Sequence, residues 1–308
     1  MTTSVTARAP GKVNIQLSVG GVREDGFHPL ASVFHAVALH EEVTAEAGEP
    51  GSGIVIDQVT GLQVDEVPRD STNLVWRAAE RLAAELGAPA PDVRLSISKG
   101  VPVAGGMAGG SADCAAALVA LNDLWGAELG RDDLARVALD LGSDVPFSLM
   151  GGTALGLGRG ELLSPLMARG TFHWVFATAT QGLSTPAVYS AFDRLVQGRI
   201  VPEPEADAAI SAALIAGDAA ALGRVLHNDL QEPALTLRPT LRDVLDAGRA
   251  AGALGGIVSG SGPTVAFLVA DEMAATQVSA AVAGLEQVRG CFTTSGPAPG
   301  ARVIRREP

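Results

Sequence analysis

Apolar and polar residues alternate near the start of the chain as they do in a β-strand with one buried face. The apolar positions run from Val13 to Val19 at every second residue, and the opposite face carries Lys12 and Asn14 side by side. After two glycine turns, the apolar stretch 31–39 is expected to pair back as the second strand of a hairpin. Further strands are predicted at 54–56, 93–97, 172–177, 264–269 and near 303.

Apolar residues spaced three or four positions apart predict helices between these strands. One helix is expected to begin at Asp70 and to hold Asn73 in its first turn. A soft boundary near residues 163–170 divides the chain into two units of mixed helices and strands, 1–165 and 166–308, and the last strand is expected to close the second unit. Further helices are predicted at 131–141, from 185 onward, within 203–223, at 241–251 and at about 272–285.

A glycine-rich stretch, P-V-A-G-G-M-A-G-G-S-A-D at 102–113, lies between the strand at 93–97 and a helix that ends at Gly126. Its four glycines let peptide N–H groups turn toward one point, which suits a phosphate. Ser111 is expected to cap the helix and Asp113 to lie in its first turn, so that the positive end of the helix dipole faces the loop. The alternative is a flexible connector, which the strand before and the helix after disfavour.

The loop lacks the lysine of the common phosphate-binding motif. Gly105 and Gly110 have the glycine spacing of G-x-x-x-x-G-K-[ST], but neither the lysine nor the hydroxyl residue follows in its place. Lys12 and Lys99 are the only lysines among 22 basic residues. Because lysine offers a compact, mobile ammonium that arginine cannot replace, we expect a functional role for Lys12; for Lys99 a structural role is equally open.

Composition narrows the classes of protein that the chain can represent. With 308 residues, 47% of them hydrophobic and 18% charged, it is expected to form a soluble globular protein of two domains. A net charge of −12 argues against partners that need a broad basic surface, so neither nucleic acid nor membrane is expected. Two cysteines, the absence of a signal peptide and the absence of an apolar run of membrane-spanning length predict a cytoplasmic protein without disulfides or a metal cluster.

Seven short pieces of the chain resemble one enzyme family. A-P-G-K-V-N at 9–14, the glycine stretch at 102–113 and S-G-S-G-P-T-V at 259–265 resemble the three motifs of the GHMP kinases, which phosphorylate galactose, homoserine, mevalonate and phosphomevalonate. D-G-F-H at 25–28, S-T-N-L at 71–74, G-S-D-V-P-F at 142–147 and H-N-D-L at 227–230 resemble the branch that acts on a cytidine diphosphate alcohol of non-mevalonate isoprenoid synthesis. The resemblance implies an α+β fold of two domains, the first similar to domain 2 of ribosomal protein S5 and the second ferredoxin-like, with the site between them.

The resemblance also implies a role for individual residues. Asp144, which by itself would be taken for a turn residue, would be the general base, and Lys12 would pair with it and steady the transferring phosphoryl group. ATP and Mg²⁺ would be used, with Ser111 near the β-phosphate or the metal and Asn73 beside the adenine, and no metal site made of protein ligands alone. The acceptor site would include Asn14, Phe27, His28, Thr185 and Tyr189. The ATP phosphates would lie on Pro102, Val103, Ala104, Gly105, Gly106, Met107, Ala108, Gly109, Gly110, Ser111 and Ala112.

Phe27 stands where the family commonly has tyrosine, so the ring is kept and a hydroxyl is lost. We expect Phe27 and Tyr189 to sandwich the cytosine and His28 to read its edge, although either ring could equally pack in a core. The partners expected are ATP and a cytidine diphosphate alcohol, with the chain a monomer or a weak homodimer. Two alternatives remain: another small-molecule kinase of the family, such as a homoserine or mevalonate-type kinase, or a non-catalytic ATP-binding regulator. Retention of both Lys12 and Asp144 argues against the regulator.

Overall fold

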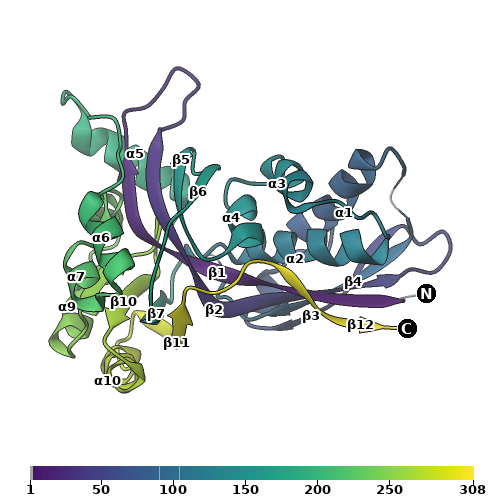
Figure 1. Ribbon diagram of the computed structural model, residues 1–308. Helices are drawn as coiled ribbons and strands as arrows, with labels where there is room; N and C mark the ends of the chain where they lie inside the picture. Colours follow the sequence, from purple (N-terminus) through teal and green to yellow (C-terminus); the bar gives the residue numbers. More distant parts are fainter. Residues whose placement is uncertain (1–2, 90, 104) are drawn as a thin grey trace.

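The long hairpin predicted near the start of the chain runs through the whole molecule (Figure 1). Strands β1 (Ser4–Val19) and β2 (Leu30–Ala47) pair in antiparallel fashion along most of their length. The second strand of the hairpin is predicted only at 31–39, but β2 continues to Ala47 because Val43 and Ala45 alternate with polar residues and face the core. The computed structural model describes residues 3–89, 91–103 and 105–308.

The last strand of the chain closes the first sheet. The sequence assigns this strand to the second unit, but β12 (Arg302–Glu307) pairs with β1, with Ser4 opposite Glu307. An uncovered edge of β1 would leave a row of unpaired N–H and C=O groups, and β12 satisfies them. The two ends of the chain therefore lie side by side (Figure 1). The order of the main path is β12-β1-β2-β4-β3, and the other strands of this sheet are β3 (Ile54–Gly61), β4 (Val93–Lys99), β5 (Thr153–Gly158), β6 (Leu162–Pro165) and β8 (His227–Asn228).

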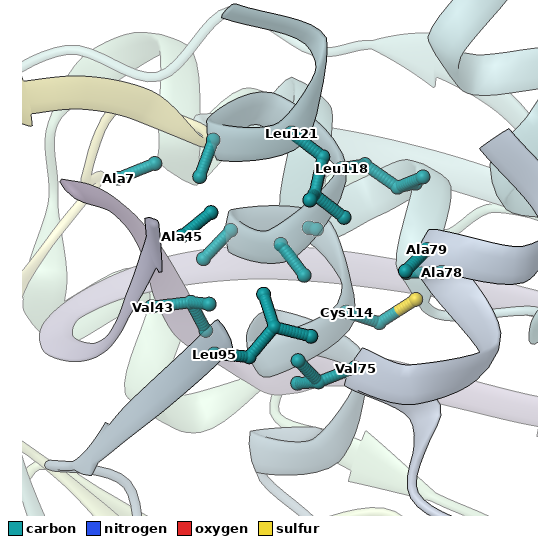
Figure 2. Close-up of a cluster of buried hydrophobic side chains, with 14 of the residues drawn as sticks. Ala7, Val43, Ala45, Val75, Ala78, Ala79, Leu95, Cys114, Leu118 and Leu121 are labelled. Atoms are coloured by element: carbon teal, nitrogen blue, oxygen red, sulfur yellow. The ribbon is translucent and has the colours of Figure 1, made fainter. Parts of the chain in front are cut away.

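Helix α2 (Gly109–Leu124) lies between this sheet and helix α1 (Leu74–Glu85), as Figure 2 shows. Five of its sixteen residues are alanines, whose small side chains let the backbone approach both neighbours closely, so the helix is buried nearly all round. Its fully buried side chains include Ala112, Cys114, Ala115, Ala116, Ala117, Leu118, Ala120 and Leu121. Helices α3 (Arg131–Leu139) and α4 (Val145–Met150) and the short 3₁₀ helix η1 (Val64–Glu66) complete this half.

The starts of α1 and α2 differ from the prediction. Helix α1 begins after Asn73, whose side chain caps it by accepting from the N–H of Val75 at 2.8 Å. Helix α2 begins two residues before the predicted cap, because Ala108 takes the left-handed conformation with φ 59° and ends the loop there. Ser111 therefore lies inside the first turn. Asp113 lies beyond it, and its side chain turns inward to Lys99 and does not face the helix dipole.

The second sheet has the strand order β11-β7-β10-β9, and all its neighbours are antiparallel. With helices between its first and second and between its third and fourth strands, this is the split βαβ arrangement of a ferredoxin-like domain, as predicted. Its strands are β7 (Phe172–Ala179), β9 (Gly255–Val258), β10 (Val265–Val269) and β11 (Val288–Gly296). Its helices are α5 (Thr185–Val196), α6 (Ala208–Ala216), α7 (Ala219–Arg224), α8 (Gln231–Leu237), α9 (Leu241–Ala250) and α10 (Glu272–Ala283).

The sequence patterns do not reveal β9, β11, α4 or α8. Two glycines begin β9, and β11 carries Gly290 and a mostly half-buried run of polar residues, so neither strand shows clean alternation. Helices α4 and α8 have six and seven residues, too few for a helical period. None of the described helices is long and apolar enough to cross a membrane.

A shared core joins the two sheets. Val13 and Ile15 of β1 pack with Trp174 and Phe176 of β7, and all four side chains are fully buried. His35 of β2 lies at the edge of this core, with Nδ1 2.8 Å from Thr153 Oγ1 and its ring edge-on to an aromatic neighbour. Burial lowers the pKa of His35 to about 4.

Protonation of His35 is expected to destabilise the protein in acid. Because the pKa of His35 is depressed in the folded chain, its contribution to stability is present above about pH 6.5 and is lost as the pH falls toward about 4. The His35→Gln variant should therefore lose about 3 kcal/mol less stability than the wild type over that interval. Urea unfolding between these two pH values measures the difference. His173→Gln, at a half-buried site on β7, is the control, and equal slopes in all three proteins would contradict the assignment.

Candidate active site

A cleft of about 430 Å³ lies between the two halves of the molecule. Its wall is formed by β1, β2, the glycine loop with the start of α2, the turn before α4, the start of α5 and the second glycine turn at 259–263. Among the described residues that line it, Asp144 is the only carboxylate, and Lys12 and Arg159 are the only cations. An acidic protein thus presents two positive charges and one negative charge in this cleft.

Lys12 is held in the cleft by the strand that carries it. Its Nζ donates to Asn14 Oδ1 at 2.6 Å, and Asn14 in turn donates to Ser32 Oγ at 2.7 Å. The ammonium also lies 3.7 Å from Asp144 Oδ2 and 5.7 Å from the ring centre of Phe34. Burial lowers the pKa of Lys12 below its ordinary value, and the nearby Asp144 carboxylate opposes this shift. The result is a poorly solvated, oriented cation, which acts strongly on any charge that enters the cleft.

Asp144 precedes α4 but does not cap it. Its backbone carbonyl accepts from the N–H of Ser148, and its side chain makes no capping hydrogen bond. Pro146 in the first turn restrains the direction of the turn. The carboxylate is therefore held in position by its backbone and is left free to face Lys12 and the cleft.

Two hydrogen bonds to its backbone carbonyls anchor the glycine loop. The N–H of Lys12 donates to the carbonyl of Met107 at 3.1 Å, and Ser259 Oγ donates to the carbonyl of Gly106 at 3.1 Å. The first residues of α2, Gly109 to Ser111, line the cleft, and the N–H groups of a first helical turn have no partner inside the helix. These donors and the positive end of the helix dipole form an anion site of the kind that binds phosphate.

Tyr189 lines the cleft, whereas His28, which its ring contacts, does not. The ring of Tyr189 stacks on that of His28 with 5.2 Å between centres. His28 Nδ1 donates to the carbonyl of Gly20 at 2.8 Å, and Nε2 lies 3.4 Å from Asp193 Oδ1. Burial, followed by the charge of Asp144, raises the pKa of Tyr189 to about 12, so its phenol stays protonated at physiological pH.

Phe27 does not line the cleft and is half exposed on the turn between β1 and β2. The guanidinium of Arg159 lies 3.6 Å above the centre of its ring and 3.2 Å from Asp25 Oδ2. Arg159 itself reaches the cleft wall. In this structure Phe27 thus packs against Arg159, while Tyr189 packs against His28, and the two rings predicted to face each other have different partners.

Comparisons with known proteins agree with this geometry. The profile of the GHMP kinases N terminal domain matches residues 73–152, and that of the GHMP kinases C terminal domain matches residues 210–285. The chain belongs to the GHMP kinase family. It is 54% and 56% identical to proteins of Streptomyces coelicolor and Streptomyces avermitilis named 4-diphosphocytidyl-2-C-methyl-D-erythritol kinase, over 98% of this chain and 99% and 100% of theirs. A crystal structure of 4-(cytidine 5'-diphospho)-2C-methyl-D-erythritol kinase superposes with a TM-score of 0.76 at 31% identity, covering 94% of this chain and 98% of the other.

Most residues predicted for a GHMP kinase site meet in the cleft. Pro102, Val103, Met107 and Ala112 do not line it, and Ala104 lies outside the described residues. Asn73 does not line the cleft, and its two polar atoms bind the backbone of Val75 and Pro68, so its predicted place beside the adenine stays a prediction. The predicted residues that do line the cleft are Lys12, Asn14, Gly105, Gly106, Ala108, Gly109, Gly110, Ser111, Asp144, Thr185 and Tyr189.

Eight residues that line the cleft of this GHMP kinase were not among the predicted site residues: Leu17, Leu30, Phe34, Leu74, Arg159, Leu230, Gly260 and Ser261. Phe34 lies within an apolar strand and Arg159 is one of many arginines, so neither carries a local signal. Ser261 belongs to the second glycine turn, whose motif was noticed without a role for the side chain. Its hydroxyl lies 2.8 Å from that of Thr185 and joins the turn to the start of α5. The S-G-S-G motif was the signal that pointed to this contact.

Two glycines of the loop provide a matched pair of variants. Gly110 has open space around it, with Leu74 Cδ1 the nearest atom at 3.8 Å from an added Cβ, whereas a Cβ on Gly106 would meet Ser259 O at 2.2 Å and φ there is +67°. We expect Gly110→Val to fold normally and to raise the KM for ATP by about tenfold or more, because its side chain enters the phosphate site.

Gly106→Ala should in addition lower the melting temperature, since the backbone must move. Calorimetric melting and steady-state kinetics distinguish the two effects. A Gly110→Val protein whose KM for ATP is unchanged would exclude this loop as the phosphate site.

Proposed function

We propose that Lys12, Asp144 and the glycine loop transfer the γ-phosphoryl group of ATP to the 2-hydroxyl of 4-diphosphocytidyl-2-C-methyl-D-erythritol, giving the 2-phosphate and ADP. The activity follows from the near full-length identity to the Streptomyces kinases, and it belongs to the non-mevalonate route to isoprenoid precursors. The observation that carries the assignment of residues is the Lys12–Asp144 pair, 3.7 Å apart in a cleft that also contains the start of α2.

Phosphoryl transfer requires positioning and charge stabilisation more than covalent chemistry from the protein. Asp144 accepts the proton of the acceptor hydroxyl as its oxygen bonds to the γ-phosphorus, and the bond from that phosphorus to ADP breaks. Lys12 stabilises the negative charge that develops on the transferring group, since it is oriented by Asn14 and poorly solvated. The N–H groups of Gly109 to Ser111 hold the phosphates that stay with ADP. This division explains why the loop functions without a lysine of its own.

A magnesium ion fits the polar groups of the cleft. Mg²⁺ in such sites is held by one or two carboxylates or hydroxyls together with substrate phosphates and water. No cluster of three or more His, Cys, Asp or Glu side chains that could bind a metal occurs in the described part of the chain. Asp144 and Ser111, which both line the cleft, are the groups that would hold the ion together with ATP. The bound ion would neutralise charge on the phosphates.

We assign residues to the acceptor substrate from the chemistry of their side chains. Tyr189 provides an aromatic face for the cytosine, and His28, stacked on Tyr189, lies close enough to fix that ring or to reach the edge of the base. Arg159 is the second cation of the cleft wall, and guanidinium groups bind diphosphates through several donors. One of these donors meets Asp25, which leaves others for the substrate. We therefore place the diphosphate of the acceptor at Arg159.

Two alternative functions predict experimental results that differ from those expected under this proposal. A kinase for homoserine or mevalonate would have no use for an aromatic face such as that of Tyr189, because neither acceptor carries a base that could stack on it, and a panel of acceptor alcohols tests this alternative. A non-catalytic regulator would bind ATP without ADP release. Two free cysteines support a reducing compartment such as the cytoplasm as the place of the reaction.

The Asp144→Asn variant tests the general base. Without a proton acceptor, kcat should fall by about 10²–10⁴, while the affinity for ATP stays close to that of the wild type. Coupled ADP-release kinetics and calorimetric titration with ATP measure the two quantities. Asp140→Asn, on an exposed carboxylate four residues earlier, is the control and should keep full activity. A variant of Asp144 with more than about half of the wild-type kcat would refute this role.

The Tyr189→Ala variant tests recognition of the base. Stacking on a base contributes roughly 1–3 kcal/mol, so the KM for the cytidine substrate should rise about 5- to 150-fold. The KM for ATP should stay within about threefold, and Tyr189→Phe should behave like the wild type because it keeps the ring. A matching rise in both KM values would show a general disturbance of the cleft.

The same assay tests the cation of the acceptor end. Arg159→Gln should raise the KM for the acceptor by about tenfold, whereas Asp25→Asn should not raise it. The Asp25→Asn change removes the carboxylate charge that faces the guanidinium, while its amide oxygen can still accept from the N–H of Phe27. Equal effects of the two variants would mean that Arg159 acts by holding the turn at Asp25 and not by binding the diphosphate.

A further inference from the structure

Three charged side chains form a buried cluster beside the glycine loop. Lys99 ends β4, Glu41 lies on β2 and Asp113 lies just beyond the first turn of α2. Lys99 Nζ is 2.6 Å from Glu41 Oε1 and donates to Asp113 Oδ2. The side chains of Lys99, Glu41 and Asp113 are only 2%, 0% and 7% exposed, and none of them lines the cleft. The reaction described above uses none of these groups.

The cluster holds both ends of the loop. Where the loop begins, the N–H of Gly100 donates to Glu41 Oε2 at 3.0 Å. Where it ends, a Cβ on Gly109 would lie 2.9 Å from Glu41 Oε1, so the first residue of α2 rests against the same carboxyl group. Lys99 and Asp113 connect β4 to α2 across the same point. The three charged side chains of this cluster therefore fix the distance between the two ends of the loop.

The cluster contains two carboxyl groups and one ammonium. Unless one carboxyl keeps a proton, a negative charge is buried without a partner, which is costly. Burial raises the pKa of Glu41 to about 8, with the charge of Asp113 acting in the same direction, and burial raises the pKa of Asp113 to about 6. The Cys114 thiol on α2 lies within reach of the charge of Asp113, and Arg77 on α1 acts on that thiol in the opposite direction. At neutral pH the cluster thus carries one positive charge, one negative charge and a proton.

We propose that Glu41, Lys99 and Asp113 position the glycine loop for ATP, and that loss of the proton held by their carboxyl groups at alkaline pH releases this positioning. The inference rests on the assignment of the loop to the ATP phosphates. Deprotonation leaves a second buried negative charge that one ammonium cannot compensate, and it does so beside both ends of the loop. The same charge repels the phosphates that the loop has to bind.

The affinity for ATP is then expected to depend on pH through this cluster. Calorimetric titration with a non-hydrolysable ATP analogue should show a loss of about tenfold in the wild type between about pH 7 and about pH 9, because one linked proton changes affinity about tenfold per unit above its pKa. Glu41→Gln should be flat over this range, since its amide oxygen still accepts from Gly100 and it has no proton to lose. The affinity of Asp113→Asn for the analogue should also be independent of pH, because its one remaining carboxylate is balanced by the one ammonium.

Controls separate positioning from simple stability. Glu42→Gln, at the next residue on β2 and paired with Arg8 at the surface, should keep the pH dependence of the wild type. The KM for the acceptor should not change with pH in any of these proteins, and kcat at saturating ATP should change less than about threefold. Melting temperatures recorded at the same pH values show whether the fold is intact, because a raised carboxyl pKa also lowers stability as the pH rises through it.

Distinct results would overturn the proposal. A wild-type affinity that does not change with pH, or a Glu41→Gln protein that follows the wild type, would show that the cluster only stabilises the fold. A pH dependence shared equally by the acceptor would indicate partial unfolding. If the analogue binds at no pH, the assignment of the loop to ATP fails, and this inference fails with it.

Discussion

The organisation of the cleft depends on one buried cation. Lys12 has little solvent around it, and its ammonium can stay there only because Asn14 and Asp144 supply oxygen atoms. The strand that carries Lys12 therefore has to run between both halves of the molecule, and the backbone N–H of Lys12 also donates to the carbonyl of Met107 in the glycine loop. The segment of β1 around Lys12 thus positions both the buried cation and the glycine loop, so a shift of this strand moves both.

Separation of the cation from the phosphate loop follows from how α2 is packed. The first turn of α2 is made of glycine and serine, and the rest of the helix is buried on nearly all sides. A long side chain at Gly110 would enter the cleft where the phosphates are expected to bind. The backbone therefore supplies the donors at this end, and side chains from β1 and the turn before α4 supply the charges at the other. Phosphoryl transfer tolerates this division because its demands are positional and electrostatic.

An acidic chain handles two anionic substrates by concentrating its positive groups. Its net charge of −12 is spread over the surface, while the cleft contains Lys12, Arg159 and the helix N-terminus. The cluster of Glu41, Lys99 and Asp113 extends the same principle to the interior, where one proton keeps the charge behind the loop balanced. In this kinase, single side chains therefore determine the electrostatic potential in the cleft and behind the glycine loop.

Elements with a strong hydrophobic period and residues in a distinctive motif could be predicted from the sequence. The hairpin of β1 and β2, the long helices, the glycine loop and Lys12 are visible in it, because alternation, glycine spacing and a rare lysine are local signals. Asp144 was found only through the family resemblance of its G-S-D-V-P-F motif. Only the tertiary structure decided that the last strand joins β1, that Asn73 caps α1 and that Asp113 turns inward to Lys99. Arg159 and Phe34 reach the cleft through long-range packing. Strands β9 and β11 form because neighbouring strands provide their hydrogen-bond partners, and the pattern of their own residues does not predict a strand. Contacts between segments that are distant in the sequence produce no periodic pattern of residues, so only the three-dimensional structure reveals them.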